Sequence, residues 1–463
     1  MDKITPREWL IWLAILIIDL ALVLNIDSTY DSGDSVLHFL YSSQAFEYPK
    51  YLMDHWAKPV FVLLSAPFAQ LGWWGMQFFN SLCILGSSFF LFQLFKSYHL
   101  KSWLAVLLTF SAPLYFLVQS SGLTEPLFAL FLTASIYYLK KDQLWLSLVL
   151  LSFLPFVRSE GWIIAPIVII YLISLKKFKW IPILLIGTVV YGIIGHFYYD
   201  DFLWMFNQNP YSGAEEKYGS GNWLHFFNQL PYVIGIPLFT LVLIGLYDGF
   251  YRAVRSQMSL HEFFLIYGIA LGYFMAHTVF WAEGLFHSFG LNRVLIVIIP
   301  LFAFIAYRGI ERIACAFSFI NSKYIWYTFC GLVIIFPFTG NKAALRLPGS
   351  IQKEPLQILT DEVRDYCDSS FGERKIYYGC AYIPMIFDKD IDNSLESERI
   401  GMIKKIPADQ GSLVVWDSYF AVTDQDITEE ELNLKPELTL VKKFECVECR
   451  SKYWINVYLS ESK

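Results

Sequence analysis

The sequence predicts a polytopic α-helical membrane protein with a small α/β domain at its C-terminal end. Of its 463 residues, 56% are hydrophobic and 18% aromatic, and the mean hydropathy is +0.45. These values exceed what a soluble globular protein usually carries. Many apolar runs are long enough to cross a hydrocarbon core of ~30 Å, which takes ~20 helical residues. From residue 341 onward the apolar runs shorten and charged residues become frequent, which marks a change of domain.

The first domain, residues 1–340, is predicted to contain the membrane-spanning helices. Roughly eleven segments satisfy the length criterion for a span. Their approximate bounds are 9–26, 73–95, 103–118, 122–139, 143–157, 162–175, 180–198, 231–250, 262–280, 292–307 and 324–340. No small-residue cleavage site follows the first of them, so we expect an uncleaved anchor rather than a signal peptide.

Lysine and arginine residues predict how these spans are oriented. Cations near span ends are retained on the cytoplasmic side of a membrane, and here they occupy every second connection. They are Lys96, Lys101, Lys140, Lys141, Lys176, Lys177, Lys179, Arg252, Arg255, Arg308 and Arg312. We therefore expect a multi-pass protein of the cell membrane with a cytoplasmic N-terminus. The connections 27–72, 119–121, 158–161, 199–230 and 281–291, and the C-terminal domain, would then lie outside the cytoplasm.

The second domain, residues 341–463, is predicted to be a compact α/β module. The segment 351–368 has the pattern of an amphipathic helix, and runs beginning at 375, 412, 438 and 453 have the composition of strands. Cys446 and Cys449 form a CxxC pair, which without a second pair or nearby histidines is a weak zinc or redox signal. A local disulfide or two free thiols are the alternatives, and an oxidising compartment favours the disulfide.

The formal net charge of −6 argues against one class of partner. Apart from the orienting loops, the sequence has no cluster of basic residues of the kind that binds a phosphate backbone. We therefore expect no nucleic-acid partner.

The first outer loop concentrates polar residues between two apolar runs. If residues 31–46 are helical, Asp31, Asp34 and His38 stand at i, i+3 and i+7 and share one face. An amphipathic helix lying on the bilayer surface would show the same pattern without a function. Further along, Asp54, His55 and Lys58 precede Pro59, and the residue before a proline is driven out of the α region. Lys58 should therefore leave the helix.

These motifs resemble the membrane glycosyltransferases called GT-C. The resemblance rests on "GD" at 33–34, "KP" at 58–59 and the apolar helix that follows, together with "SGLTEPLFALF" at 121–131 and "RSEGW" at 158–162. GT-C enzymes include the protein O-mannosyltransferases, the aminoarabinose transferase acting on lipid A, and the glycosylphosphatidylinositol and N-glycan mannosyltransferases. Their usual first-loop signature has two adjacent acids, whereas Ser35 follows Asp34 here. The resemblance covers residues 1–340.

The resemblance implies a GT-C fold and a glycosyl transfer at the outer membrane face, favouring a bacterial inner membrane. A single sugar, mannose-like, would pass from a polyprenyl-phosphate donor to a hydroxyl of a glycan, lipid or protein acceptor. No cofactor is expected, and Asp31 with Asp34 alone would be a poor divalent-metal site. Because phosphate leaves without a protonated acid, one base and a cationic clamp suffice for a single displacement.

Candidate roles follow for residues at the outer ends of spans. Asp34 is the expected base, with Asp31 as second choice, and Lys58, Arg158 and Arg293 would bind the donor phosphate. Structural alternatives are an Arg158–Glu160 ion pair and interfacial anchoring by Arg293. Possible substrate-binding residues are His38, Asp54, His55, Glu125 and Glu160. For Glu125, the favourable position of an acid at a helix start is a sufficient non-functional explanation.

Two further expectations concern polar groups elsewhere in the first domain. Asp19 lies inside an apolar run, where a charge at mid-bilayer is unfavourable by about 2.5–3.5 kcal/mol, so it should face a partner within the bundle. The aromatic loop 199–230 could contact a sugar or form an interfacial belt. The rival function is a transporter or flippase for a lipid-linked sugar, which would place its functional groups near the membrane midplane, often in two related halves.

Overall fold

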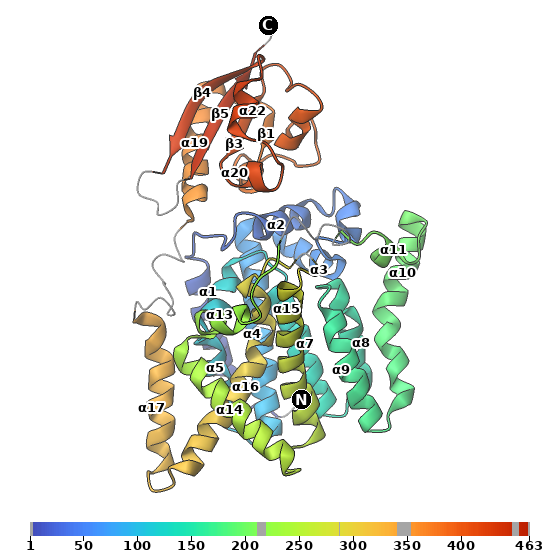
Figure 1. The fold of residues 1–463 in the computed structure, drawn as a ribbon, viewed down its shortest axis with the longest axis vertical. Coiled ribbons are helices and arrows are strands. Elements are labelled where there is room, and N and C mark those ends of the chain that lie inside the picture. Colours follow the sequence, from blue (N-terminus) through green and yellow to red (C-terminus); the bar gives the residue numbers. More distant parts are fainter. Residues whose placement is uncertain (1–2, 211–218, 287, 340–352, 447–452, 462–463) are drawn as a thin grey trace.

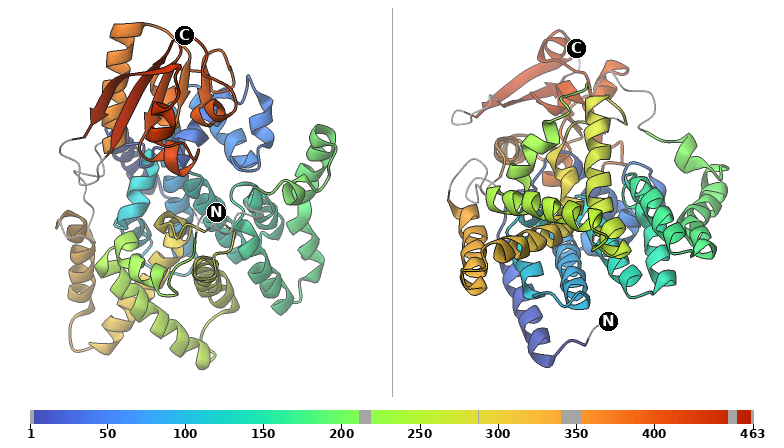
Figure 2. Two further views of the ribbon diagram at one scale, coloured as in Figure 1. Left: turned by 45° about the horizontal axis from the view of Figure 1, so that its top comes forward. Right: turned by 60° about the horizontal axis from the view of Figure 1, so that its bottom comes forward.

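The computed structural model contains a large helical bundle and a small sheet-containing domain stacked on one end of it (Figure 1). It describes residues 3–210, 219–286, 288–339, 353–446 and 453–461. The predicted boundary between residues 340 and 341 lies outside these ranges, as does Cys449 of the CxxC pair. Two further views show the same stacking, with α10 and α17 at opposite edges of the bundle (Figure 2).

The bundle is built from helices of very different lengths, several of which begin with a proline in the first turn, where its missing N–H is not needed. The α-helices are α1 (Pro6–Val23), α2 (Asp34–Gln44), α3 (Pro59–Ala69), α4 (Trp73–Ser97), α5 (Trp103–Phe110), α6 (Pro113–Leu117), α7 (Glu125–Lys140), α8 (Leu144–Phe153), α9 (Gly161–Ser174), α10 (Ile186–Tyr199), α11 (Trp204–Asn207), α13 (His225–Ile234), α14 (Ile236–Val254), α15 (Ile269–Ala282), α16 (Ile299–Ala316) and α17 (Ser322–Ile335). Short 3₁₀ segments are η1 (Pro49–Met53), η2 (Val118–Ser120), η3 (Leu154–Phe156), η4 (Phe178–Leu185), η6 (Asn292–Ile298) and η7 (Phe336–Phe338), and η5 (Glu262–Gly268) is a π-helix.

The helix lengths support a multi-pass membrane protein. Within the described residues, five helices are long and apolar enough to cross a membrane: 73–97, 178–199, 236–254, 262–282 and 292–316. The segment predicted as one span at 103–118 is instead two helices, 103–110 and 113–120, that meet at 87° and would add a sixth crossing if counted together. Pro113 explains the break, because proline cannot continue the preceding helix. The predicted number of eleven spans stays a prediction.

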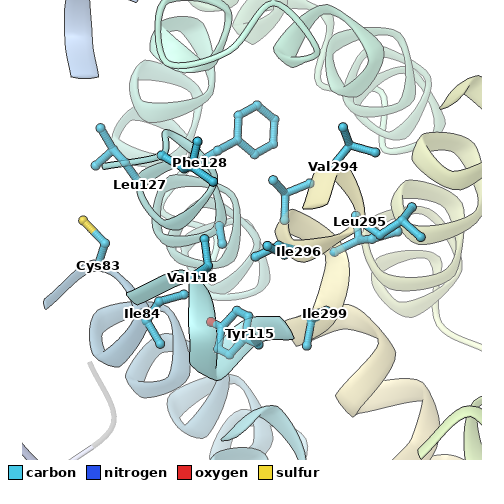
Figure 3. Packing of buried hydrophobic residues seen from close by; sticks show 14 of the residues in the cluster. Cys83, Ile84, Tyr115, Val118, Leu127, Phe128, Val294, Leu295, Ile296 and Ile299 are labelled. Carbon is cyan, nitrogen blue, oxygen red and sulfur yellow. The ribbon is translucent and has the colours of Figure 1, made fainter. Parts of the chain in front are cut away.

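A continuous hydrophobic core joins helices near the end of the bundle that carries the C-terminal domain. Side chains of α4, α6, η2, α7, η6 and α16 meet there; Figure 3 labels Cys83, Ile84, Tyr115, Val118, Leu127, Phe128, Val294, Leu295, Ile296 and Ile299. Phe128 and Ile296 are fully buried. Because η6 packs against α7 through this core, Arg293 at the start of η6 has a fixed position.

Asp19 faces the interior of the bundle, as predicted. It is buried in α1, and its carboxylate accepts a hydrogen bond of 2.7 Å from the hydroxyl of Ser81 in α4. Ser81 lies 3.2 Å from the amide oxygen of Gln119, so the carboxylate belongs to a small polar group. The partner that the sequence could not name is Ser81.

The C-terminal domain is an α/β module with a five-stranded mixed sheet of order β2-β1-β3-β5-β4. β1 pairs in parallel with β2 and β3, while β5 pairs antiparallel with β3 and β4. The elements are α19 (Pro355–Phe371), β1 (Ile376–Tyr378), α20 (Tyr382–Ile386), β2 (Ser397–Arg399), η8 (Ile400–Lys404), β3 (Leu413–Asp417), α21 (Phe420–Thr423), α22 (Glu429–Asn433), β4 (Leu438–Glu445) and β5 (Trp454–Ser460). The predicted helix and four strands are confirmed, and β2 is a strand that the sequence pattern missed.

Candidate functional site

The polar residues of several distant segments meet at the end of the bundle that carries the C-terminal domain. The segments are the first loop with the start of α2, the turn before α3, the start of α7, the connection between η3 and α9, and the start of η6. We call the ion pairs among Asp31, Asp34, Glu125, Arg158, Glu160 and Arg293 the domain-end network. All of its members were candidate site residues from the sequence.

Asp31 and Asp34 do not share one helix, which corrects the expectation that residues 31–46 are helical. The helix starts at Asp34, and Gly33 before it has φ −100° and ψ −96°. The Asp31 carboxylate turns back and accepts a 2.6 Å hydrogen bond from the Gly33 N–H. This side-chain turn competes with helix formation, as short acidic side chains commonly do. It places both carboxylates on the same side of the loop.

Arg293 holds these two carboxylates together. One guanidinium nitrogen lies 2.5 Å from Asp31 Oδ2, and another pairs with Asp34 Oδ2. Its Nε atom is 3.6 Å from Glu125 Oε1. A guanidinium group suits this fork-like recognition because its donors are planar and fixed. Arg293 is therefore part of an ion-pair network with Asp31, Asp34 and Glu125.

Glu125 links Arg293 to the second arginine of the network. Its Oε1 atom lies 2.7 Å from Arg158, and the side chain has no exposed surface. Arg158 also pairs with Glu160 at 2.6 Å and donates a hydrogen bond of 3.0 Å to the hydroxyl of Thr124. The predicted Arg158–Glu160 pair thus exists, but it extends to Glu125 and onward to Arg293. The favourable position of Glu125 at the first residue of α7 is confirmed as well.

Lys58 approaches the network from the turn before α3. Its backbone adopts φ 70°, so it leaves the helix as Pro59 predicts. The ammonium donates hydrogen bonds to the His55 carbonyl at 2.7 Å and to the Ser159 hydroxyl at 2.9 Å. Because Ser159 lies between Arg158 and Glu160, Lys58 stands directly beside the domain-end network.

A small hollow of about 10 Å³, room for about one water molecule, adjoins Lys58 on the side of α11. Its lining residues are His55, Lys58, Pro59, Pro155, Phe156, Trp204 and Met205. His55 is held there by a 2.8 Å hydrogen bond between its Nε2 atom and the Met205 carbonyl. Part of the loop 199–230 therefore borders the site, while its residues 211–218 lie outside the described ranges. Asp54 has a local role, accepting a 2.7 Å hydrogen bond from the Ala57 N–H.

Exposure separates the carboxylates of the network. The Asp34 side chain keeps 44% of its surface exposed and Asp31 keeps 26%, whereas Glu125 has none. Asp34 is therefore the carboxylate most open to an incoming molecule. His38, a predicted substrate-binding residue, is buried; its ring stacks on Trp56 at 4.5 Å and its Nδ1 atom lies 2.7 Å from the Asp34 carbonyl.

The surrounding charges set the protonation states at this end of the bundle. Burial favours the neutral acid at Asp34, but Arg293 outweighs it and holds the pKa below its usual range. Burial likewise opposes ionisation of Glu160, yet Arg158 and His277 lower its pKa to about 2. Burial lowers the pKa of Lys58 to about 7, because nearby Glu160 only partly compensates. Both acids are thus ionised at neutral pH, and Lys58 titrates near it.

Several residues next to the network were not found from the sequence. Ser159 and Thr124 orient Lys58 and Arg158 by hydrogen bonds. Tyr273 and His277, one helical turn apart in α15, lie close to Arg158 and Glu160. Tyr273 and His277 are polar side chains inside an apolar span, and this property was the sequence signal that could have identified them as site residues. Within the ranges that the structure describes, no three His, Cys, Asp or Glu side chains gather in a way that could hold a metal ion.

Known structures resemble this chain although its sequence matches none closely. No protein-family profile and no curated protein sequence matches. The crystal structure of ArnT from Cupriavidus metallidurans bound to undecaprenyl phosphate matches with a TM-score of 0.62 and 10% identity, over 98% of each chain. Its apo form matches with the same TM-score and identity, over 97% of this chain and 98% of ArnT. The predicted fold is thereby supported, since the chain shares the fold of ArnT over nearly its whole length.

Proposed function

We propose that this protein transfers a single sugar from a polyprenyl-phosphate carrier to a hydroxyl group of an acceptor at the outer membrane face. The observation that carries the proposal is the convergence of three cations with two partly open carboxylates. The cations are Lys58, Arg158 and Arg293, and they come from three segments of the chain. The fold supports the proposal, since ArnT, which shares it over nearly the whole chain, binds undecaprenyl phosphate.

The proposed reaction is a single displacement in which Asp34 acts as general base. The acceptor oxygen attacks the anomeric carbon, its proton passes to the Asp34 carboxylate, and the bond from that carbon to the phosphate oxygen breaks. Asp34 is preferred to Asp31 because its side chain is more exposed and because it starts α2, whose backbone fixes it. Cations placed where charge grows on the leaving phosphate stabilise the transition state. The reaction uses no cofactor.

Arg293 and Arg158 already bind carboxylates in this structure, so a donor phosphate competes with those carboxylates for the guanidinium groups. Arg293 lowers the basicity of Asp34 by pairing with it. If the phosphate draws Arg293 away, the pKa of Asp34 rises toward the pH at which the enzyme works, and general-base catalysis improves. The base would then become active when the donor is bound.

Lys58 gives the phosphate a second point of contact. It lines the hollow beside α11 and hydrogen-bonds Ser159, the residue next to Arg158. A carrier lipid arriving from the side of α11 would meet Lys58 first and the arginines next. His55 and Trp204 line the same small hollow, so a sugar or carrier unit would bind there only if these side chains moved.

The finer assignments follow the sequence motifs. We propose a mannose-like sugar, an acceptor that is a glycan, lipid or protein, a cytoplasmic N-terminus and an outward C-terminal domain. The chain would work in a cell membrane, with a bacterial inner membrane favoured. None of these assignments alters the roles of Asp34, Lys58, Arg158 and Arg293.

The test is a transfer assay with the purified protein in lipid vesicles. A panel of polyprenyl-phosphate sugars, each with a labelled sugar, is offered together with candidate glycan, glycolipid and protein acceptors. We expect label to move from one donor to one acceptor class, and the variant Asp34→Asn to abolish most of that transfer. Movement of the intact labelled lipid across the bilayer without transfer would instead identify a flippase and contradict the proposal.

A further inference from the structure

The first loop, which carries Asp31 and Asp34, is enclosed between the bundle and the C-terminal domain. We infer that Glu354 and Gln357, at the start of α19, are positioning residues that hold this loop so that its carboxylates meet Arg293. The inference rests on the proposed function, in which Asp34 is the base. It gives the C-terminal domain a part in the reaction itself.

The direct contacts come from the first turn of α19. The Ser32 hydroxyl donates a 2.7 Å hydrogen bond to Glu354 Oε2, and the Gln357 side-chain amide donates one to the Thr29 hydroxyl. That hydroxyl in turn donates to the Asp31 carbonyl at 3.0 Å. Gln357 is itself fixed, because its Oε1 atom accepts a 3.1 Å hydrogen bond from the Glu354 N–H. Ser32 and Thr29 of the loop are thus hydrogen-bonded to the first turn of α19.

Two more contacts from the C-terminal domain close over the same loop. The Phe420 ring covers Gly33 so closely that a Cβ atom there would lie 2.8 Å from the ring. The Cys380 thiol donates a 3.4 Å hydrogen bond to the Ser32 carbonyl. Ser32 and Gly33 are the two residues between the candidate bases Asp31 and Asp34, so the C-terminal domain contacts the backbone that separates them.

The bundle holds the opposite side of the loop. The Ser35 hydroxyl donates to the Thr29 carbonyl at 2.7 Å and accepts a hydrogen bond of 2.7 Å from the Gly122 N–H. Gly122 approaches so closely that a Cβ atom would lie 2.2 Å from the Ser35 carbonyl. With both faces fixed, the loop has little freedom, and a small shift would change the distance from Asp34 to Arg293.

A separate contact between the domain and the bundle supplies a matched control. The Tyr48 hydroxyl donates a 2.6 Å hydrogen bond to Asp390, and Lys50 pairs with Asp392 at 2.5 Å. These residues join the same two parts of the molecule, and their hydrogen bond and ion pair do not involve residues 28–35. Weakening them tests docking of the domain, whereas changing Glu354 or Gln357 tests the position of the loop.

The pH profile of the reaction distinguishes positioning from simple stabilisation. The charged and titratable groups around Asp34 are Arg293, His38, Arg158, Glu125, Asp31, Tyr30 and Glu354. Arg293 keeps the pKa of Asp34 low by contact. If the loop loosens, this contact lengthens and the pKa moves up toward that of an ordinary aspartate. The acidic limb of kcat/KM against pH, which reports the free enzyme before the donor displaces Arg293, then shifts to higher pH. Loss of protein stability alone does not produce this shift.

The experiment compares kcat, donor KM and the pH profile of variants in lipid vesicles. In Gln357→Glu a carboxylate faces the Thr29 oxygen without a proton to donate, and in Glu354→Ala the Ser32 hydroxyl loses its acceptor. For both we expect kcat to fall by about 10- to 100-fold, since displacements near 1 Å have effects of this size. The donor KM should stay within about twofold, because the phosphate contacts are elsewhere.

Glu354→Gln keeps an acceptor oxygen for Ser32 and should restore most of the rate. Tyr48→Phe and Glu362→Ala, the latter on the exposed face of α19, should leave rate and pH profile unchanged. Hydrogen exchange of the amides of residues 28–35 should quicken only in Gln357→Glu and Glu354→Ala. Parent values of kcat, pH profile and exchange in these two variants would overturn the inference. If the parent protein transfers no sugar at all, the proposed function fails, and the exchange measurement still tests the contact.

Discussion

Among the residues of the bundle that the structure describes, two networks of ion pairs differ in how far their acids are exposed. The far-end network consists of Asp248, Arg252, Glu262, Arg308 and Glu311. Glu262 lies at its centre, 2.5 Å from Arg252 and 3.1 Å from Arg308. All of its members lie within α14, η5 or α16, and their neighbours close around Glu262, whose side chain is 4% exposed.

The domain-end network uses the same residue types at the ends of helices. Asp34 and Glu125 are the first residues of α2 and α7, Arg158 lies between two helices, and Arg293 is the second residue of η6. Position at a helix start does not by itself decide exposure, because Asp34 keeps 44% of its side-chain surface exposed whereas Glu125 keeps none and Glu262, the first residue of η5, keeps 4%. The domain-end network therefore offers an open carboxylate at Asp34, whereas the central acid of the far-end network is closed. The following predictions test that contrast.

The largest expected effect is on the rate, from Asp34→Asn. The amide keeps size and most hydrogen bonding but cannot accept the proton, so turnover should fall by about 10²- to 10⁴-fold. Thermal unfolding should change little, and donor binding should survive because the carboxylate acts on the acceptor. Asp248→Asn in the far-end network is the matched control and should transfer at the parent rate. A nearly normal rate in Asp34→Asn beside an inactive Asp31→Asn would make Asp31 the base.

The next effect is on stability, from Glu262→Ala. Removing one partner of a buried ionic group leaves the others uncompensated, which typically destabilises a protein by about 3–5 kcal/mol. Here Arg252 and Arg308 lose their shared acid. We expect a lower unfolding temperature in vesicles, with kcat of the folded fraction unchanged. Unaltered stability together with reduced kcat would show that the far-end network takes part in the reaction.

A smaller effect concerns donor affinity and pH. A sugar-bearing phosphodiester keeps one negative charge near neutral pH, so the titrating group is Lys58, whose pKa burial lowers to about 7. Its cation is present below that pH and lost above it, so donor affinity should weaken by up to about tenfold per pH unit above neutrality. The variant Lys58→Arg stays charged and should remove the dependence. An equal dependence in this variant would exclude Lys58 as its source.

The smallest effect is expected for an exposed ion pair. Lys177 pairs with Asp142, which is 73% exposed. Exposed pairs contribute about 0–1 kcal/mol, so Lys177→Ala should alter unfolding and transfer hardly at all. A loss as large as that of Glu262→Ala would mean that burial is not what distinguishes the far-end network.

Local properties of the sequence predicted much of this molecule. Apolar length predicted the helical class, and Asp19 was predicted to face the bundle because a charge in lipid is unfavourable. The orientation predicted from the spacing of the cations stays a prediction. The position of Lys58 outside α3 followed from Pro59. The strand β2 was missed because its three residues, Ser-Glu-Arg, include no apolar or β-branched side chain. The start of α2 was misplaced because the side chain of Asp31, not its backbone propensity, ends the loop.

Contacts between distant segments could not be predicted from one sequence. Glu125 and Arg158 were both candidates, but nothing in their neighbourhoods states that they pair with each other rather than with adjacent charges. The same holds for Ser32 and Glu354, which belong to different domains. Helix starts and polar residues indicate which groups can act, while packing of the bundle decides which of them meet.

The backbone of Lys58 has a consequence for engineering of this protein. Its φ of 70° lies in the left-handed region, where a residue with a side chain is strained by about 1–3 kcal/mol and glycine is not. Replacing Lys58 by glycine would relieve the strain and remove a buried charge together. A screen that selects only for heat resistance would therefore enrich glycine at this position. The most heat-resistant variants would then lack the cation proposed to bind the donor phosphate.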